Sequence, residues 1–247
     1  MADREVQVYK DLDAVAEAAA KLFIQLAATQ TSEDSPFNVA LSGGSTPKAL
    51  YRFLSSPEYK TQLDWSLINL FWGDERPVPP DHPDSNYKLA AEGLAEVPIE
   101  RENIHRYLTE TGTPAQVAAA YAEELRGYFH KGVGEFPSFD LILLGMGPDG
   151  HTASLFPGTA ALHNSSDLVV ANYVPKLAVE RLTFTAPLIN AARCVVFLVA
   201  GADKAAAVRE VLEGAVNSDL YPSQLVAPQA GKLIFMLDEV AATGLTK

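Results

Sequence analysis

The sequence predicts an α/β fold in which one domain holds a mainly parallel sheet covered by helices. Three observations lead to this prediction. Short apolar runs alternate along the 247 residues with segments whose apolar residues recur at helical spacing, the pattern of strands joined by crossover helices. The run 141–144 is apolar throughout, as expected of a strand buried on both faces. Glycine-rich turns directly follow several of the apolar runs.

Composition and charge narrow the class of protein. The chain is 48% hydrophobic, which is enough for the core of a single domain over residues 1–247. Its net charge of −12 argues against a surface that binds nucleic acid. In so acidic a protein, an anionic substrate would need a local group of basic residues. No run approaches transmembrane length, and residues 1–5 lack the apolar core of a signal peptide. We therefore expect a cytoplasmic protein without membrane contact.

The elements of the N-terminal third follow from alternation and periodicity. Residues 5–9 alternate apolar and polar side chains and predict the first strand, and residues 11–29 carry an apolar face at helical spacing. Residues 37–41 predict the next strand. The segment 48–54 then predicts a helix whose first turn suits Pro47, because proline lacks the N–H that would need a partner there.

The middle of the chain repeats this alternation. Residues 67–72 predict a strand, and Ser85 can cap a helix over 86–94. A short strand is expected at 104–107, and a clear helix at 113–130.

The C-terminal half is expected to follow the same pattern. After the strand 141–144, residues 151–156 are expected to begin a short helix that ends at 157–158. The remaining expected strands are 168–173, 182–185, 193–200 and 232–237, and the remaining helices are 186–191 and 201–212.

The turn Gly145-Met146-Gly147-Pro148-Asp149-Gly150-His151 is the strongest candidate for a site. Its three glycines within six residues permit positive φ and close approach of a ligand to the backbone. It follows a buried strand, and ligands of open α/β sheets bind beyond the carboxyl ends of strands. A tight turn with a solvated Asp149 and His151 is the alternative interpretation, and we favour function.

The segment Ser42-Gly43-Gly44-Ser45-Thr46-Pro47 is a second candidate. Exposed amides, two hydroxyls and a helix N-terminus together suit a phosphate group. The segment lacks the Gly-Lys-Ser/Thr of a P-loop, so an ordinary turn is an equally good interpretation of this segment alone.

Charged residues past other strands complete the set. Asp74, Glu75 and Arg76 directly follow a strand and precede a stiff proline-rich loop; a surface ion pair is the alternative interpretation. Lys204 opens a helix after a glycine turn, and Arg181 begins its own strand. A phosphate cradle, up to three cations and one histidine near carboxylates suit a small phosphorylated substrate and general-base chemistry.

Metal binding is not expected. Cys194 is the only cysteine, and its apolar surroundings indicate a buried structural thiol, which excludes cysteine-based zinc sites. The sequence has five histidines: His82, His105, His130, His151 and His163. No two of them have the spacing of metal ligands on one face of a helix.

Three segments in register resemble the 6-phosphogluconolactonase family, within the larger group that contains glucosamine-6-phosphate deaminase/isomerase. They are 42–47, Trp72-Gly73-Asp74-Glu75-Arg76 with the sequence 81–87, and 145–158. The resemblance covers nearly the whole chain. It implies a Rossmann-like α/β/α fold and hydrolysis of 6-phospho-D-glucono-1,5-lactone to 6-phosphogluconate without a required cofactor. The deaminase relatives carry a catalytic Glu five residues after the His, where this chain has Phe156, so the resemblance disfavours deamination.

The mechanism expected on this basis is direct attack of water on the lactone. His151 is the expected general base, since an imidazole titrates near neutral pH. Asp149 orients the imidazole or the substrate hydroxyls, and Asp74 holds sugar hydroxyls or the water. Arg76 serves either the oxyanion or the phosphate. The expected phosphate ligands are Gly43, Gly44, Ser45, Thr46, Arg181 and Lys204.

Two rival hypotheses remain open at the level of the sequence. A sugar-phosphate deaminase or isomerase is the enzymatic rival, and Phe156 argues against it. A catalytically silent regulator that binds a sugar phosphate is the other rival, and the Asp149/His151 pair argues against it. The expected partner is the sugar-phosphate substrate alone, bound by a monomer that contacts neither nucleic acid nor membrane.

Overall fold

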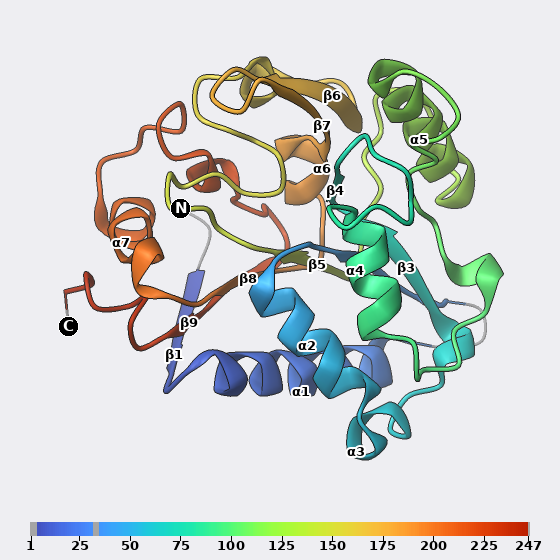
Figure 1. Cartoon of the computed structure of the whole chain (residues 1–247), viewed down its shortest axis with the longest axis horizontal. Helices are drawn as coiled ribbons and strands as arrows, with labels where there is room; N and C mark the ends of the chain where they lie inside the picture. The colour runs from blue at the N-terminus through green and yellow to red at the C-terminus, as the bar shows by residue number, and fades with distance from the viewer. Residues whose placement is uncertain (1–3, 32–34, 247) are drawn as a thin grey trace.

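The computed structural model describes residues 4–31 and 35–246, and a six-stranded parallel sheet forms its centre (Figure 1). Every strand pair in this sheet is parallel. From one edge to the other the strands are β1 (Arg4–Tyr9), β9 (Lys232–Asp238), β8 (Cys194–Val199), β5 (Leu141–Leu144), β2 (Phe37–Leu41) and β3 (Ile68–Trp72).

Helices cover both faces of this sheet (Figure 1). One face carries α1 (Leu12–Gln30) and α2 (Ser45–Ser55), and the opposite face carries α5 (Pro114–Tyr128), α6 (Ala186–Asn190) and α7 (Ala205–Glu213). This division follows from right-handed crossovers between parallel strands. The connections through α1 and α2 lead from β1 by way of β2 to β3, in one direction across the sheet. The connections through α5, α6 and α7 lead back in the opposite direction, so these helices cover the opposite face. The arrangement confirms the prediction of a Rossmann-like α/β/α fold. The shorter helices are α3 (Pro57–Lys60), α4 (Asn86–Gly93), and the 3₁₀ turns η1 (Trp65–Leu67), η2 (Arg101–Asn103), η3 (Ala160–His163), η4 (Ala202–Lys204) and η5 (Pro222–Leu225).

The core sits on the two faces of the central strands. All residues of β5 and β8 are buried, as the unbroken apolar run of β5 predicts. Phe71 of β3 packs its ring at 5.2 Å from Phe139 and 5.2 Å from Tyr128, the last residue of α5, so aromatic contacts join α5 to the sheet. Each such buried side chain contributes about 2 kcal/mol through removal of apolar area from water.

A second, antiparallel sheet stands beside the first, in the order β4 (Asp74–Glu75), β7 (Val179–Phe184) and β6 (Val169–Val174). The sequence predicts strands near β6 and β7 but not their separation into another sheet. Only the turn 175–178 joins them, and a connection this short permits an antiparallel pair alone. Because β7 begins at Val179, Arg181 lies within that strand rather than at its start.

Two predicted elements are wrong. Residues 104–107 form no strand, because only Ile104 bridges to Leu70 of β3. Residues 151–156 form no helix: Ala153 takes a left-handed φ of 47°, and Thr152 bridges to Leu155 instead. The amide of Ser154 donates to β7 rather than to the preceding turn, so long-range partners replace the hydrogen bonds a helix would need.

The strand order creates a crevice between β2 and β5. After β2 the chain turns to one face and continues outward to β3, whereas after β5 it turns to the other face and continues toward β8. The loops that follow β2 and β5 therefore diverge. Open α/β sheets bind their ligands at such a point of divergence.

Candidate active site

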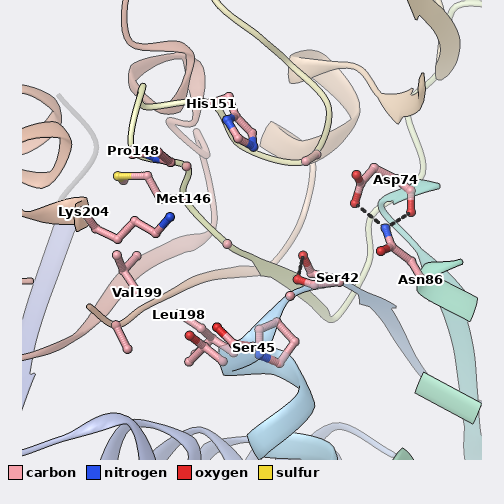
Figure 2. Close-up of a pocket in the computed structure, with 18 of the residues that line it drawn as sticks. Ser42, Ser45, Asp74, Asn86, Met146, Pro148, His151, Leu198, Val199 and Lys204 are labelled. Atoms are coloured by element: carbon pink, nitrogen blue, oxygen red, sulfur yellow. Dashed lines mark hydrogen bonds between the residues drawn. The ribbon is translucent and has the colours of Figure 1, made fainter. Parts of the chain in front are cut away.

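A cavity of about 220 Å³ opens at the carboxyl ends of β2, β3, β5 and β8 (Figure 2). Four separate stretches of chain supply its lining, and most of the residues singled out in the sequence are among them. The lining residues are 42–47, Asp74, Arg76 and Asn86, 145–148 with His151 and Ala153, and 198–200 with Lys204. The structure thus brings together segments that lie up to 162 residues apart (204 − 42).

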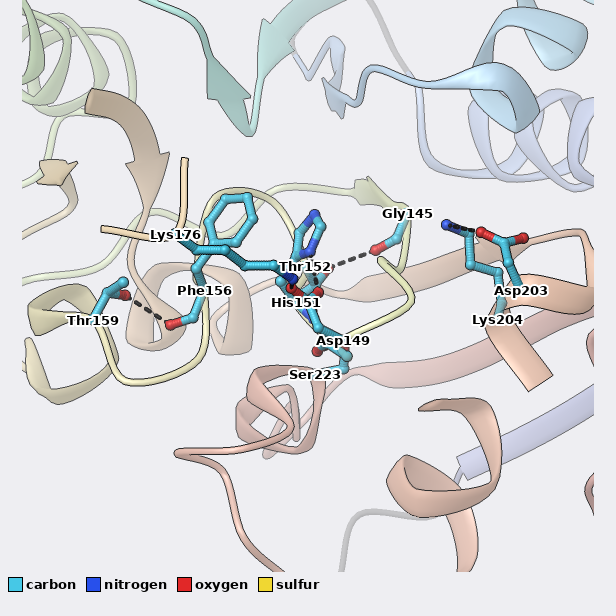
Figure 3. Close-up of polar contacts among 11 residues, drawn as sticks. Gly145, Asp149, His151, Thr152, Phe156, Thr159, Lys176, Asp203, Lys204 and Ser223 are labelled. Atoms are coloured by element: carbon cyan, nitrogen blue, oxygen red, sulfur yellow. Dashed lines mark hydrogen bonds and ion pairs between the residues drawn. The ribbon is translucent and has the colours of Figure 1, made fainter. Parts of the chain in front are cut away.

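His151 is tied to a carboxylate through one ring nitrogen (Figure 3). Its Nδ1 lies 2.6 Å from Oδ1 of Asp149, and Oδ2 of the same carboxylate accepts a hydrogen bond from Nζ of Lys176 at 2.9 Å. The bond to His151 is the largest of the contacts that hold the pKa of Asp149 well below its usual range. An ionised carboxylate can only accept, so Nδ1 carries a proton, and in the neutral imidazole Nε2 is the nitrogen with the free lone pair.

The turn around His151 fixes the ring from the backbone side. The amide of Gly147 donates to the carbonyl of His151 at 2.9 Å, and Gly150 takes a φ of 74° to close the turn. A Cβ at position 147 would overlap Nδ1 and Cε1 of the imidazole. Only glycine at 147 therefore lets the ring lie in this place.

Asp74 is buried beside the cavity, both of its carboxylate oxygens accept hydrogen bonds, and Figure 2 shows its contact with Asn86. Oδ2 accepts a hydrogen bond from Oγ of Ser154 at 2.8 Å, and Oδ1 accepts one from Nδ2 of Asn86 at 3.2 Å. These contacts connect the loop of His151 to the loop that follows β3. Asp74 therefore holds the two walls of the cavity in register.

Glu75 is not part of a surface ion pair. Its carboxylate is buried and accepts hydrogen bonds from the amides of Arg76, Asn86 and Tyr87 and from the hydroxyl of Ser85. Burial raises the pKa of this carboxyl, and the amide hydrogen bonds oppose that rise. The carboxylate thereby fixes both the start of α4 and the loop between residues 76 and 85.

Replacing Glu75 with glutamine is expected to lower the free energy of unfolding by about 2–4 kcal/mol. The amide would retain one oxygen and turn an NH₂ group toward backbone donors, leaving buried groups unsatisfied. Urea denaturation measures the loss. The matched control is Glu92→Gln, since Glu92 is exposed and pairs with Lys88 at 3.8 Å, and about 0.5 kcal/mol or less is expected there. Equal stability of the two variants would contradict the role of Glu75.

Three cations lie at or near the cavity. Arg76 and Lys204 line it, and Arg181 lies outside the lining. Burial, together with the nearby charge of Arg76, lowers the pKa of Arg181. Within residues 4–31 and 35–246, neither arginine forms an ion pair with a carboxylate, whereas Lys204 pairs with Asp203 at 2.9 Å. Guanidinium groups without a carboxylate partner suit an anionic ligand.

The loop after β2 offers amides to the same cavity. Gly44 takes a φ of 108° before α2, which begins at Ser45, earlier than the sequence predicts. No side chain caps this helix, so its first amides lack a capping partner. A Cβ on Gly43 would overlap Oδ1 of Asn86, which explains glycine at that position. The phosphate cradle predicted at Gly43, Gly44, Ser45 and Thr46 therefore has open amides at a helix N-terminus.

The structure adds residues that the sequence does not single out. Lys176 lies in the turn between β6 and β7, and Ser154 and Asn86 bind Asp74. No local pattern marks these three, because each contact joins segments that only the fold brings together. Phe156, noted in the sequence only for its lack of a carboxylate, stacks on the ring of His151 five residues earlier.

Two further features concern metals and membranes. Among the residues that the structure describes, no three His, Cys, Asp or Glu side chains cluster in a way that could hold a metal ion. In the same part of the chain, no helix combines the length and apolar character needed to cross a membrane.

The chain is similar to known proteins along almost its entire length. Residues 10–235 match the family model described as glucosamine-6-phosphate isomerases/6-phosphogluconolactonase. The 6-phosphogluconolactonase of Nostoc sp. (strain PCC 7120) is 42% identical over 244 residues, covering 98% of this chain and 99% of that protein. The 6-phosphogluconolactonase of Synechocystis sp. (strain PCC 6803) is 48% identical over 208 residues, 84% of each chain. Among solved structures, 6-phosphogluconolactonase from Trypanosoma brucei superposes with a TM-score of 0.89 at 30% identity, covering 100% of both chains.

Proposed function

The chain belongs to the glucosamine-6-phosphate isomerase/6-phosphogluconolactonase family, and we propose that it hydrolyses 6-phospho-D-glucono-1,5-lactone to 6-phospho-D-gluconate with His151 as general base. This reaction is the second step of the oxidative pentose phosphate pathway. The observation that carries the proposal is the pairing of Nδ1 of His151 with Asp149 at 2.6 Å, beside a cavity bordered by cations and open amides. Such a pair leaves Nε2 able to take a proton.

In the proposed reaction, Nε2 of His151 removes a proton from a water molecule while the water oxygen attacks C1 of the lactone. The carbonyl π electrons move to the carbonyl oxygen and form a tetrahedral oxyanion. When the oxyanion collapses, the bond from C1 to the ring oxygen breaks, and the proton on Nε2 passes to that oxygen. Asp149 stabilises the imidazolium formed between these two transfers and holds its orientation.

The substrate is anchored at its far end by its phosphate. The amides of the loop 43–46 and the charges of Lys204 and Arg181 supply that site in the proposal. Arg76 borders the cavity close to Asp74, so it serves either the oxyanion or the phosphate. Asp74 already accepts from Ser154 and Asn86, and it is assigned to holding sugar hydroxyls or the water.

The environment of His151 favours hydrolysis over deamination. The side chain that packs on the imidazole is Phe156, at the position where the sequence comparison with the deaminases expects a catalytic carboxylate. A phenyl ring can neither accept nor donate the proton that release of an amine requires. The remaining parts of the proposal are one domain over residues 1–247, a monomer that works in the cytoplasm without a cofactor, and no nucleic-acid or membrane partner.

The proposal is tested by offering the wild-type protein two substrates. Freshly generated 6-phosphogluconolactone should be opened much faster than in buffer, and glucosamine 6-phosphate should release no ammonia. If the wild-type protein opens the lactone no faster than buffer alone, the proposal is wrong. Release of ammonia would favour the deaminase, and binding of 6-phosphogluconate without lactone turnover would favour the silent regulator.

A further inference from the structure

Phe156 is a buried aromatic residue whose position the hydrophobic core does not explain. Its side chain is only 8% exposed, yet it does not belong to the cluster of buried apolar residues that forms the core. Among the described residues its one close aromatic partner is His151: the ring centroids lie 4.0 Å apart and the planes meet at 21°, a stacked pair (Figure 3). Phe156 does not line the cavity, so it reaches the site only through the imidazole.

The imidazole of His151 is held on three sides. Nδ1 is tied to Asp149 along one edge, Gly147 leaves no room for even a methyl group beside Nδ1 and Cε1, and Phe156 covers a face. A ring restrained in this way has Nε2 as its remaining free polar atom. Without the phenyl ring, nothing would cover that face of the imidazole, and the imidazole could tilt about its hydrogen bond to Asp149.

The backbone that carries Phe156 is anchored independently of the stack. Its carbonyl accepts a hydrogen bond from Oγ1 of Thr159 at 2.8 Å, and Gly158 donates to Asp219 at 3.0 Å. Two residues earlier, Ser154 is bound to Asp74. The phenyl ring therefore sits on a turn that is fixed at both ends, as a supporting residue must be.

We propose that Phe156 is a positioning residue for His151, which it keeps aligned and stabilises as a cation during turnover. The proposal rests on the proposed general-base role of His151. When Nε2 takes the proton from water, the imidazole becomes a cation whose face lies on the π surface of the phenyl ring, and cations are attracted to such faces. The stack thus favours the protonated intermediate without touching the substrate.

The test compares Phe156→Leu, Phe156→Tyr and Phe53→Leu by steady-state kinetics on the lactone. Leucine keeps apolar bulk but removes the π face, so kcat should fall about 3- to 30-fold while KM stays within about twofold. Tyrosine keeps the aromatic face and should retain most of kcat. Phe53 packs edge-on against Tyr59 at 5.9 Å and does not line the cavity, so Phe53→Leu controls for loss of an aromatic pair and should match wild type.

A second measurement does not depend on the reaction. In the proton NMR spectrum, the ring current of Phe156 should move the Cε1 proton of His151 upfield, and this shift should persist in Phe156→Tyr and vanish in Phe156→Leu. A Leu variant with the kcat of wild type, or a Tyr variant as impaired as the Leu variant, would overturn the proposal. If the wild type opens no lactone, the proposed function fails, and an unchanged His151 signal in Phe156→Leu would then overturn the positioning role by itself.

Discussion

Replacing His151 with alanine is expected to lower kcat for lactone opening by about 10²–10⁴-fold, the usual contribution of a positioned general base. KM should change much less, because His151 is assigned to the water and the phosphate is anchored elsewhere. The cavity would largely remain, since most of its lining comes from other stretches of the chain. The variant would therefore still bind the substrate but activate water poorly.

The measurement uses freshly generated lactone, with spontaneous opening in buffer subtracted from both proteins. His163→Ala is the matched control, because His163 also faces an acidic residue, Asp219 at 3.5 Å, but is exposed and lies outside the cavity. That control should keep wild-type kcat. An active wild type with an unimpaired His151→Ala variant would retain lactone hydrolysis and remove His151 as its base.

Replacing Gly147 with alanine is expected to lower kcat by about 10²-fold, because a displacement of the base by about 1 Å is enough for such a loss. The added methyl group would occupy the space of Nδ1 and Cε1 of His151. The imidazole would have to move, or its hydrogen bond to Asp149 would have to break. Gly147 has no positive φ, so alanine fits its backbone and the thermal midpoint should change little.

Gly127→Ala is the control for adding a methyl group. Gly127 lies in α5, outside the cavity lining, and a Cβ there meets nothing within 4 Å, so kcat should match wild type. Both variants are compared by kcat and by thermal unfolding. A Gly147→Ala variant as active as Gly127→Ala would mean that the position of His151 is not restrained by the glycine.

The fold could be predicted wherever the local pattern and the tertiary partners agree. The strand 141–144 is apolar at every position and is buried at every position. The helix expected at 151–156 fails because Ser154 finds its partners in β7 and at Asp74, which are distant in the sequence. The separate antiparallel sheet escapes prediction for the same reason: alternation identifies strands but not the neighbour with which each one pairs.

The candidate site divides in the same way. Asp149 and His151 stand two residues apart in one turn, so their pairing follows from local geometry. The contact of Asp149 with Lys176 spans 27 residues and depends on where the turn between β6 and β7 lies. Glu75 was open to interpretation as half of a surface pair, and only its burial under the start of α4 reveals a carboxylate that binds backbone amides.

The place of β9 between β1 and β8 has a consequence for how the molecule is made. Among the described residues, β1 pairs only with β9, and the two strands begin 228 residues apart (232 − 4). At a synthesis rate of about 5–20 residues per second, β1 waits about ten seconds or more for its partner. Once β8 has been made, its edge also stays open until β9 follows, and strand edges invite wrong pairing. β1 is thus synthesised well before β9 but is incorporated into the sheet only after β9 has been made.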